Sequence, residues 1–260
     1  MARIRRVRPD DELTLVEHLD ELRVRLIVSL LVLTVAVAAC YYENDRLYTF
    51  LTGPLHLGKH HPGHLQRLIT LSPSEAFFNT IMVSVYGGLL IALPILSYQF
   101  YAYVIPAFSE ESQRTIRPML LMVPALFLIG VVFGWFIVIP PALKFLTSFN
   151  SAHLQYLPRA SDYLRFVMYT LLAMGVVFEL PVVMMMLGRV GILRSTFMKR
   201  RWREAIVVLA VIAALLPGTD PITMTAEYVP MLLLYALSYF LVKAVEPKGS
   251  ITDFLSEPFS

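Results

Sequence analysis

A single carboxylate, Glu179, lies inside an apolar stretch that is long enough to cross a lipid bilayer. The stretch runs from Phe166 to Leu187 and contains no other charged residue. A carboxylate at membrane depth costs on the order of 3 kcal/mol even on the mildest scale, so it is retained where it meets water, protein or a ligand. Glu179 is therefore a candidate for a polar contact inside the membrane. The alternative is that a neighbouring helix holds it for packing alone.

Two groups of acidic residues adjoin apolar segments elsewhere in the chain. Glu17, Asp20 and Glu21 have the i, i+3, i+4 spacing that places them on one face of a helix, although like charges at this spacing repel each other. The second group is the pair Glu110 and Glu111, which follows the second apolar run. An apolar stripe at helical spacing adjoins the first group and consists of Leu15, Leu19, Leu22 and Leu26.

Carboxylates beside an apolar surface suit a ligand that is cationic and partly apolar. A guanidinium fits best, because its planar fork can bond a carboxylate through two parallel hydrogen bonds. The alternative is that the acidic residues pair with arginines of the same chain, which are Arg23, Arg25, Arg114 and Arg117.

Motifs that would indicate an enzyme or a nucleotide-driven motor are absent from the sequence. It has no phosphate-binding glycine loop, no His-Glu-x-x-His motif and no Gly-x-Ser-x-Gly motif. Cys40 is the only cysteine, so a disulfide within the chain and a cysteine metal site are excluded. It lies in an apolar run. Four histidines between residues 56 and 64 have no accompanying carboxylate or cysteine, so we interpret them as solvated or packed in a loop. We expect no enzymatic activity, no metal and no cofactor.

The composition and the apolar runs predict a polytopic membrane protein built only from α-helices. Hydrophobic residues make up 57% of the 260 residues, and the mean hydropathy is +0.65. A spanning helix needs roughly 20 residues, with a range of about 17–25. The first four runs reach this range, whereas the last two hold about 13 and 15 residues and are predicted to be short helices or, alternatively, one re-entrant hairpin. The six runs are Leu26–Tyr42, Ala76–Phe108, Met119–Leu143, Phe166–Leu187, Ala205–Pro217 and Tyr228–Val242.

The distribution of Lys and Arg predicts the orientation. The segments on the side of the two termini hold sixteen of these residues, and those on the opposite side hold six. The excess places both termini in the cytoplasm, in a bacterial-type plasma membrane or an organelle derived from one. The predicted organisation is a single integral membrane domain with a cytoplasmic N-terminal region (1–25), a six-helix bundle (26–243), outer cap loops (43–75 and 144–165) and a cytoplasmic tail (244–260).

Several short strings of residues occur in an order that resembles one family. Together they cover about residues 12–245 and are similar to TatC, the receptor subunit of the twin-arginine protein translocase. The strings are EHLxELRxRL at 17–26, LP with QxYAY and P at 93–106, RP at 117–118, YL at 163–164, FELP at 178–181, DPIT at 220–223 and VP at 229–230.

The resemblance implies a non-enzymatic receptor in which twin-arginine signal peptides bind the cytoplasmic face. Glu21 and a glutamate of the first cytoplasmic loop would contact the arginine pair. Counting back from Pro118 places the family's loop glutamate on Ser112, so we predict Glu111 for this role, with Glu110 as the alternative. The same patch would include Glu17, Arg23 and Tyr103.

The resemblance also implies partners inside the membrane. Glu179 would engage polar groups of single-span subunits of the TatA and TatB type, with Gln99 and Glu227 as further intramembrane polar residues. Pro54 in the cap and Asp220 between the last two helices would have structural roles. Folded proteins would then cross the plasma membrane in an oligomeric complex driven by the proton-motive force. A proton-coupled secondary transporter that uses Glu179 as its relay is the alternative hypothesis.

Overall fold

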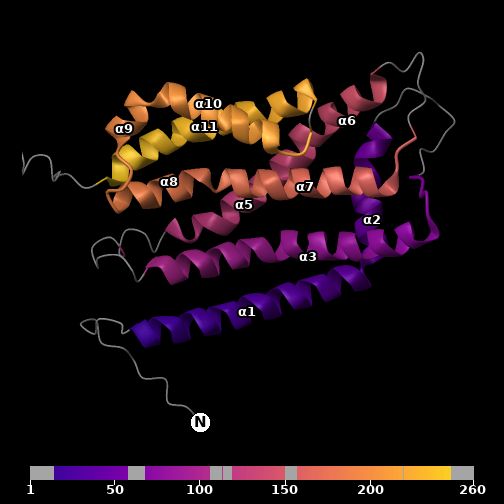
Figure 1. The fold of residues 1–260 in the computed structure, drawn as a ribbon, viewed down its shortest axis with the longest axis horizontal. Helices are drawn as coiled ribbons and strands as arrows, with labels where there is room; N and C mark the ends of the chain where they lie inside the picture. The colour runs from indigo at the N-terminus through magenta and orange to yellow at the C-terminus, as the bar shows by residue number, and fades with distance from the viewer. Residues whose placement is uncertain are drawn as a thin grey trace, which may run out of the picture.

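The chain is almost entirely helical in a computed structural model that describes residues 15–57, 68–105, 113, 119–149, 157–218 and 220–246. Its long helices lie roughly along one direction (Figure 1). This confirms the predicted all-α class. The elements are α1 (Leu15–Tyr42), α2 (Asn44–Thr52), η1 (Gly53–Leu57), α3 (Pro73–Val104), α5 (Met122–Phe133), the π-helical η3 (Gly134–Val138), α6 (Ile139–Ser148), α7 (Ala160–Phe178), α8 (Leu180–Arg189), α9 (Ser195–Arg200), α10 (Trp202–Leu215) and α11 (Pro221–Val245).

Five helical segments of the described residues are long and apolar enough to cross a membrane. They are His18–Tyr42, Pro73–Val104, Met122–Ser148, Ala160–Arg189 and Pro221–Val245. A sixth crossing, which remains a prediction, would rest on α10, whose 14 residues span about 21 Å.

The prediction that the last helix is short is wrong, because α11 has 25 residues. Asp220 caps its N-terminus, where its side chain accepts hydrogen bonds from the backbone N–H groups of Ile222 and Thr223. Pro221 then occupies the first turn, where no N–H is needed. The helix therefore begins seven residues before the apolar run at Tyr228, in polar sequence that a count of apolar residues leaves out.

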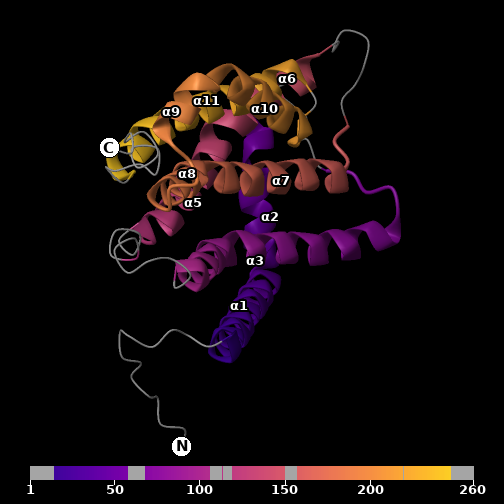
Figure 2. The same ribbon diagram turned by 60° about the vertical axis from the view of Figure 1, so that its left-hand side comes forward.

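The first and last described helices begin and end at the same end of the bundle (Figures 1 and 2). We call this the terminal end; it holds the start of α1 and the ends of α3, α8 and α11. The opposite end, with η1 and the first residues of α3 and α7, is called the cap end. The assignment of the terminal end to the cytoplasm remains a prediction from the charge distribution.

Small residues let two pairs of spans approach closely. A Cβ atom added at Gly88 of α3 would lie 2.7 Å from the backbone of Val37 in α1, and one at Gly130 of α5 would lie 2.4 Å from the carbonyl oxygen of Met174 in α7. Such contacts are typical of membrane helices, where packing rather than the hydrophobic effect holds helices together. Gly134, four residues after Gly130 as in a GxxxG motif, also approaches Met174, so this pair of glycines serves internal packing.

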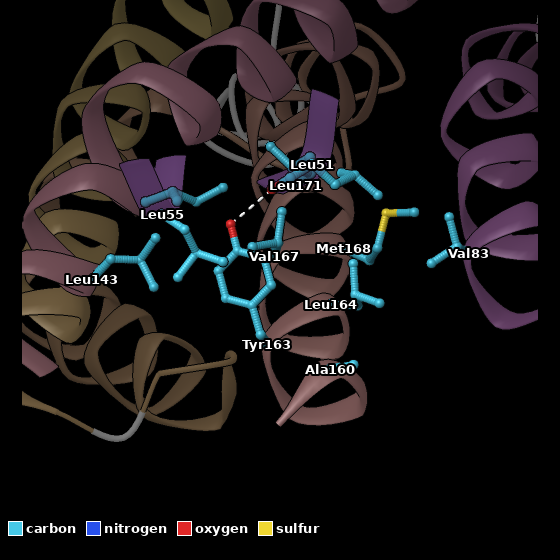
Figure 3. Close-up of a cluster of buried hydrophobic side chains, with 11 residues drawn as sticks. Leu51, Leu55, Val83, Leu143, Ala160, Tyr163, Leu164, Val167, Met168 and Leu171 are labelled. Atoms are coloured by element: carbon cyan, nitrogen blue, oxygen red, sulfur yellow. Dashed lines mark hydrogen bonds between the residues drawn. The ribbon is translucent and has the colours of Figure 1, made fainter. Parts of the chain in front are cut away.

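Residues around η1 pack against side chains of α6 and α7, as Leu55, Leu143 and Tyr163 show (Figure 3). Leu51 and Leu55 belong to this buried cluster, and Pro54 between them is also buried. The hydroxyl of Tyr163 donates to the carbonyl oxygen of Leu51 at 2.7 Å, which ties α7 to α2. Pro54 thus lies beside a buried cluster that joins α2 and η1 to α6 and α7, and its structural role in a cap stays a prediction.

Candidate functional site

The fourth spanning segment is interrupted next to Glu179. Pro181 has no backbone N–H to continue the helical ladder, so α7 ends at Phe178 and α8 begins at Leu180. The N–H of Glu179 bonds the carbonyl oxygen of Val176 at 3.1 Å. This bond joins residues three apart along the chain, as in a turn, rather than four apart as in an α-helix. The sequence Phe-Glu-Leu-Pro therefore places Glu179 at a local break within a spanning segment.

The Glu179 side chain is buried and only half satisfied by hydrogen bonds. The hydroxyl of Tyr101 in α3 donates to its Oε2 at 3.1 Å, and the Ser97 hydroxyl also lies near the carboxylate, whereas the buried Oε1 accepts no hydrogen bond of normal geometry from a described residue. Tyr101 belongs to a cluster of buried apolar side chains that includes Val123, Val182 and Met186. The arrangement leaves one strong acceptor at membrane depth available to a further donor.

A second polar cluster joins α1 to α3 at the terminal end. Arg25 donates to Oε1 of Glu21 from both Nε (2.9 Å) and Nη2 (2.6 Å), and its Nη1 donates to Oε1 of Gln99 at 2.9 Å. One turn further out, the His18 ring stacks on Tyr103 with ring centroids 4.4 Å apart. Glu21, Gln99 and Tyr103, three of the predicted site residues, therefore lie in one strip along the interface of α1 and α3.

The other predicted residues of this patch lie apart from the strip or outside the described residues. The Arg23 side chain is exposed. The arginine that pairs with Glu21 is Arg25, which agrees with the alternative interpretation that the acidic residues pair with arginines of the same chain. Glu17 belongs to α1, but its side chain is outside the described part, as are Glu110 and Glu111.

Three leucines of the α1 stripe, Leu19, Leu22 and Leu26, face away from the rest of the protein. Leu19 and Leu26 are 62% and 66% exposed, and Leu22 is also exposed. Because α1 packs mainly on α3, no described helix covers this face. An apolar surface is thus open to lipid or to a ligand directly beside the Glu21 carboxylate.

Glu227 is completely buried in α11, and neither of its carboxylate oxygens is bonded by a described residue. Among the described residues, no hydrogen bond joins Glu227 to Glu179, and Gln99 bonds Arg25. The predicted set of intramembrane polar residues is therefore dispersed over three places. Asp220 has a local role as the cap of α11.

Replacing Glu227 with methionine is expected to stabilise the protein. Burial of a polar group without a partner costs about 1–3 kcal/mol, and an apolar side chain of similar length removes that cost. The measurement is the thermal unfolding midpoint of the purified protein in detergent, which we expect to rise. Glu204→Met, at an exposed position of α10, is the matched control and should change the midpoint little. A lower midpoint for Glu227→Met would show that the carboxyl has a stabilising partner.

Sequence reasoning did not predict the hydrogen bonds from Tyr101 to Glu179 and from Arg25 to Gln99. Tyr101 did occur in the QxYAY string that resembles the family, but no role was assigned to it. Among the described residues, no group of three or more His, Cys, Asp or Glu side chains could hold a metal ion.

Most of the chain matches the sequence pattern of one known protein family. The model of "Sec-independent protein translocase protein (TatC)" matches residues 17–230. The chain belongs to the TatC family. It is accordingly a component of a protein translocase, a multi-pass membrane protein with a role in transport rather than a classical enzyme.

Individual TatC relatives agree with the family match. The TatC of Magnetococcus marinus is 33% identical over 94% of this chain and 89% of its own length, and that of Desulforapulum autotrophicum is 34% identical over 89% and 84%. A crystal structure described as the twin-arginine translocase receptor TatC superimposes with a TM-score of 0.75 at 33% identity, covering 88% of this chain and 99% of that one. The resemblance of the sequence motifs to TatC is thereby confirmed.

Proposed function

We propose that this chain is the signal-peptide receptor of a twin-arginine translocase, and that the strip between α1 and α3 binds the arginine pair. The observation that carries the proposal is the Glu21 carboxylate, which lies at the terminal end and already accepts two hydrogen bonds from a guanidinium. Both bonds end on Oε1, so the carboxylate is accessible to a guanidinium and its second oxygen, Oε2, is available as an acceptor for a ligand.

The surroundings of Glu21 fit the remainder of such a peptide. A signal peptide carries an apolar segment after its arginines, and the exposed leucines of α1 lie along the same helix as Glu21. The stacked rings of His18 and Tyr103 form the other border of the strip and offer an aromatic surface on which a guanidinium can stack. Glu111 or Glu110 would supply the second carboxylate from the adjoining loop.

Assembly with partner subunits would use the free acceptor of Glu179. A carboxyl oxygen in a low-dielectric setting gains a hydrogen bond when a polar side chain of a single-span helix packs against it. Because the sequence has no nucleotide-binding motif, the proton-motive force across a bacterial inner membrane would drive export. Membership of a protein translocase family favours this proposal over a secondary transporter.

The first test is binding of a twin-arginine signal peptide to the full-length protein in nanodiscs. Glu21→Gln is expected to weaken binding at least tenfold, because a charge-assisted hydrogen bond contributes about 1.5–3 kcal/mol. Glu204→Gln is the matched control, since Glu204 also pairs with an arginine but lies on α10. Unchanged affinity of Glu21→Gln would place the peptide site elsewhere. The same assay on Glu111→Gln and Glu110→Gln shows which of these two residues supplies the second carboxylate, because only that variant should bind the peptide more weakly.

A further inference from the structure

A short helix, α9, is held in a fixed orientation at the terminal end, where it connects α8 to α10 (Figures 1 and 2). The carboxylate of Glu246, the residue after α11, accepts hydrogen bonds from the backbone N–H and the hydroxyl of Ser195 at 2.8 and 2.7 Å. One turn later, the hydroxyl of Tyr235 in α11 donates to the carbonyl oxygen of Met198 at 3.2 Å. Ser195 and Met198 are both buried, so these bonds determine which face of α9 is exposed.

The exposed face combines cations with aromatic rings. We call it the basic platform; its members are all exposed and are Phe197, Lys199, Arg200, Arg201, Trp202 and Arg203. The guanidinium of Arg201 lies 5.5 Å from the ring centroid of Phe197, and that of Arg203 lies 5.6 Å from the ring centroid of Trp202. Glu204 is the only acidic residue between positions 190 and 219, and it pairs with Arg201. The other three cations of the platform form no ion pair with a described residue.

The platform lies where a bilayer surface meets the protein. It follows α8, which completes a segment that is long and apolar enough to span a membrane. It leads into α10, where Val207 and Val208 are exposed, as in a helix that contacts lipid. Charged residues that connect two such helices are most stable at the level of the lipid headgroups, and tryptophan is enriched at the same level.

We propose that the basic platform binds anionic phospholipids of the leaflet at the terminal end. The phosphate of a headgroup accepts charge-assisted hydrogen bonds from lysine and arginine. Phe197 and Trp202, which are 53% and 50% exposed, pack against the upper part of the acyl chains. A zwitterionic lipid carries its own ammonium beside the phosphate, so three cations without an acidic partner favour lipids with a net negative charge.

The fixed position of α9 distinguishes this site from the general excess of cations at the ends of membrane helices. Such an excess orients a membrane protein without any particular arrangement of the side chains. Here the bonds of Ser195 and Met198 hold the backbone of the platform in place, so binding a lipid does not require a loop to become ordered. An acidic protein segment would satisfy the cations, but exposed rings next to an apolar helix favour a lipid.

Trp202 itself reports on the lipid beside the platform, because Trp135 is the only other tryptophan. The full-length Trp135→Phe variant, which keeps an aromatic ring against Phe50, is placed in nanodiscs of phosphatidylcholine with a minor fraction of phosphatidylglycerol. The lipid composition stays constant, and an equal amount of either lipid carries bromine on its acyl chains near the headgroup. Bromine quenches tryptophan fluorescence on contact. We expect brominated phosphatidylglycerol to quench Trp202 about threefold more than brominated phosphatidylcholine.

Two further measurements show whether the cations cause this excess. Removing three of them together is expected to make the two brominated lipids quench Trp202 equally; the substitutions are Lys199→Gln, Arg200→Gln and Arg203→Gln. The matched control removes three exposed cations of α2, α6 and α7 and should keep the excess; its substitutions are Arg46→Gln, Lys144→Gln and Arg165→Gln.

The Trp202→Phe variant gives the same answer without any change at Trp135. The fluorescence of the unmodified protein minus that of Trp202→Phe isolates the signal of Trp202, so the test holds even if Trp135→Phe folds poorly. Equal quenching of Trp202 by the two brominated lipids would overturn the proposal and leave the cations to water or to an acidic protein. An excess that survives the removal of the three cations would overturn it as well.

Discussion

Replacing Gly130 with leucine is expected to prevent the protein from folding into a stable bundle. Even the Cβ atom of a new side chain would lie 2.4 Å from the carbonyl oxygen of Met174 and 2.8 Å from the Cβ of Phe178. Neither atom is the end of a flexible side chain, so α5 and α7 would have to separate. Overpacking of this kind costs about 1–3 kcal/mol or more. Size-exclusion chromatography and thermal unfolding in detergent should show aggregation or a strongly lowered midpoint.

Val132, also in α5, provides the control for this experiment. Its side chain is 55% exposed, so a leucine at this position adds one methylene without entering the interface with α7. Val132→Leu should therefore unfold at nearly the same temperature as the unmodified protein. A Gly130→Leu variant that elutes and unfolds normally would contradict the close approach of α5 and α7.

Replacing Glu179 with leucine is expected to reduce export of a twin-arginine reporter at least tenfold in cells that lack their own copy of the protein. The change removes the open acceptor that we propose for partner helices. It also leaves the buried Tyr101 hydroxyl without its acceptor, at a cost of about 1–3 kcal/mol. Reporter activity outside the cytoplasm and the amount of receptor in the membrane are measured together.

Tyr101→Phe separates the two effects of the Glu179 substitution. It removes the same hydrogen bond and so lowers stability by a comparable amount, but it keeps the carboxylate. We therefore expect Tyr101→Phe to export the reporter far better than Glu179→Leu at equal receptor levels. Equal loss in both variants would mean that Glu179 acts through stability alone. Glu179→Gln retains an acceptor for Tyr101 and should be the mildest of the three changes.

The sequence was sufficient to predict which residues are unusual, but less so to predict their partners. A lone glutamate in an apolar run and an acidic helix face are local patterns, and they pointed to Glu179 and Glu21. The partners lie far along the chain, since Tyr101 is 78 residues from Glu179 and Gln99 is 74 residues from Arg25. Only the packing of α3 against α1 and α7 brings these side chains together.

The length of the last helix illustrates a different limit. Apolar runs identify the part of a helix that contacts lipid or a core, and they end at the first cluster of polar residues. In α11 the helix continues through Thr223, Thr225 and Glu227, because the Asp220 cap and Pro221 determine where it starts. The capping signal was present in the sequence, but the count of apolar residues did not use it.

If α10 crosses the membrane, its small length puts the surrounding lipid under elastic stress. At about 21 Å, this helix is roughly 9 Å shorter than a typical hydrocarbon core of about 30 Å, whereas α11 beside it exceeds that thickness. Val207, Val208 and Val211 on its exposed face still require contact with acyl chains. If α10 crosses the membrane, the two leaflets must compress along this flank to keep its ends in the headgroup region. The free-energy barrier against rupture of the bilayer is then lowest beside α10, before any partner has arrived.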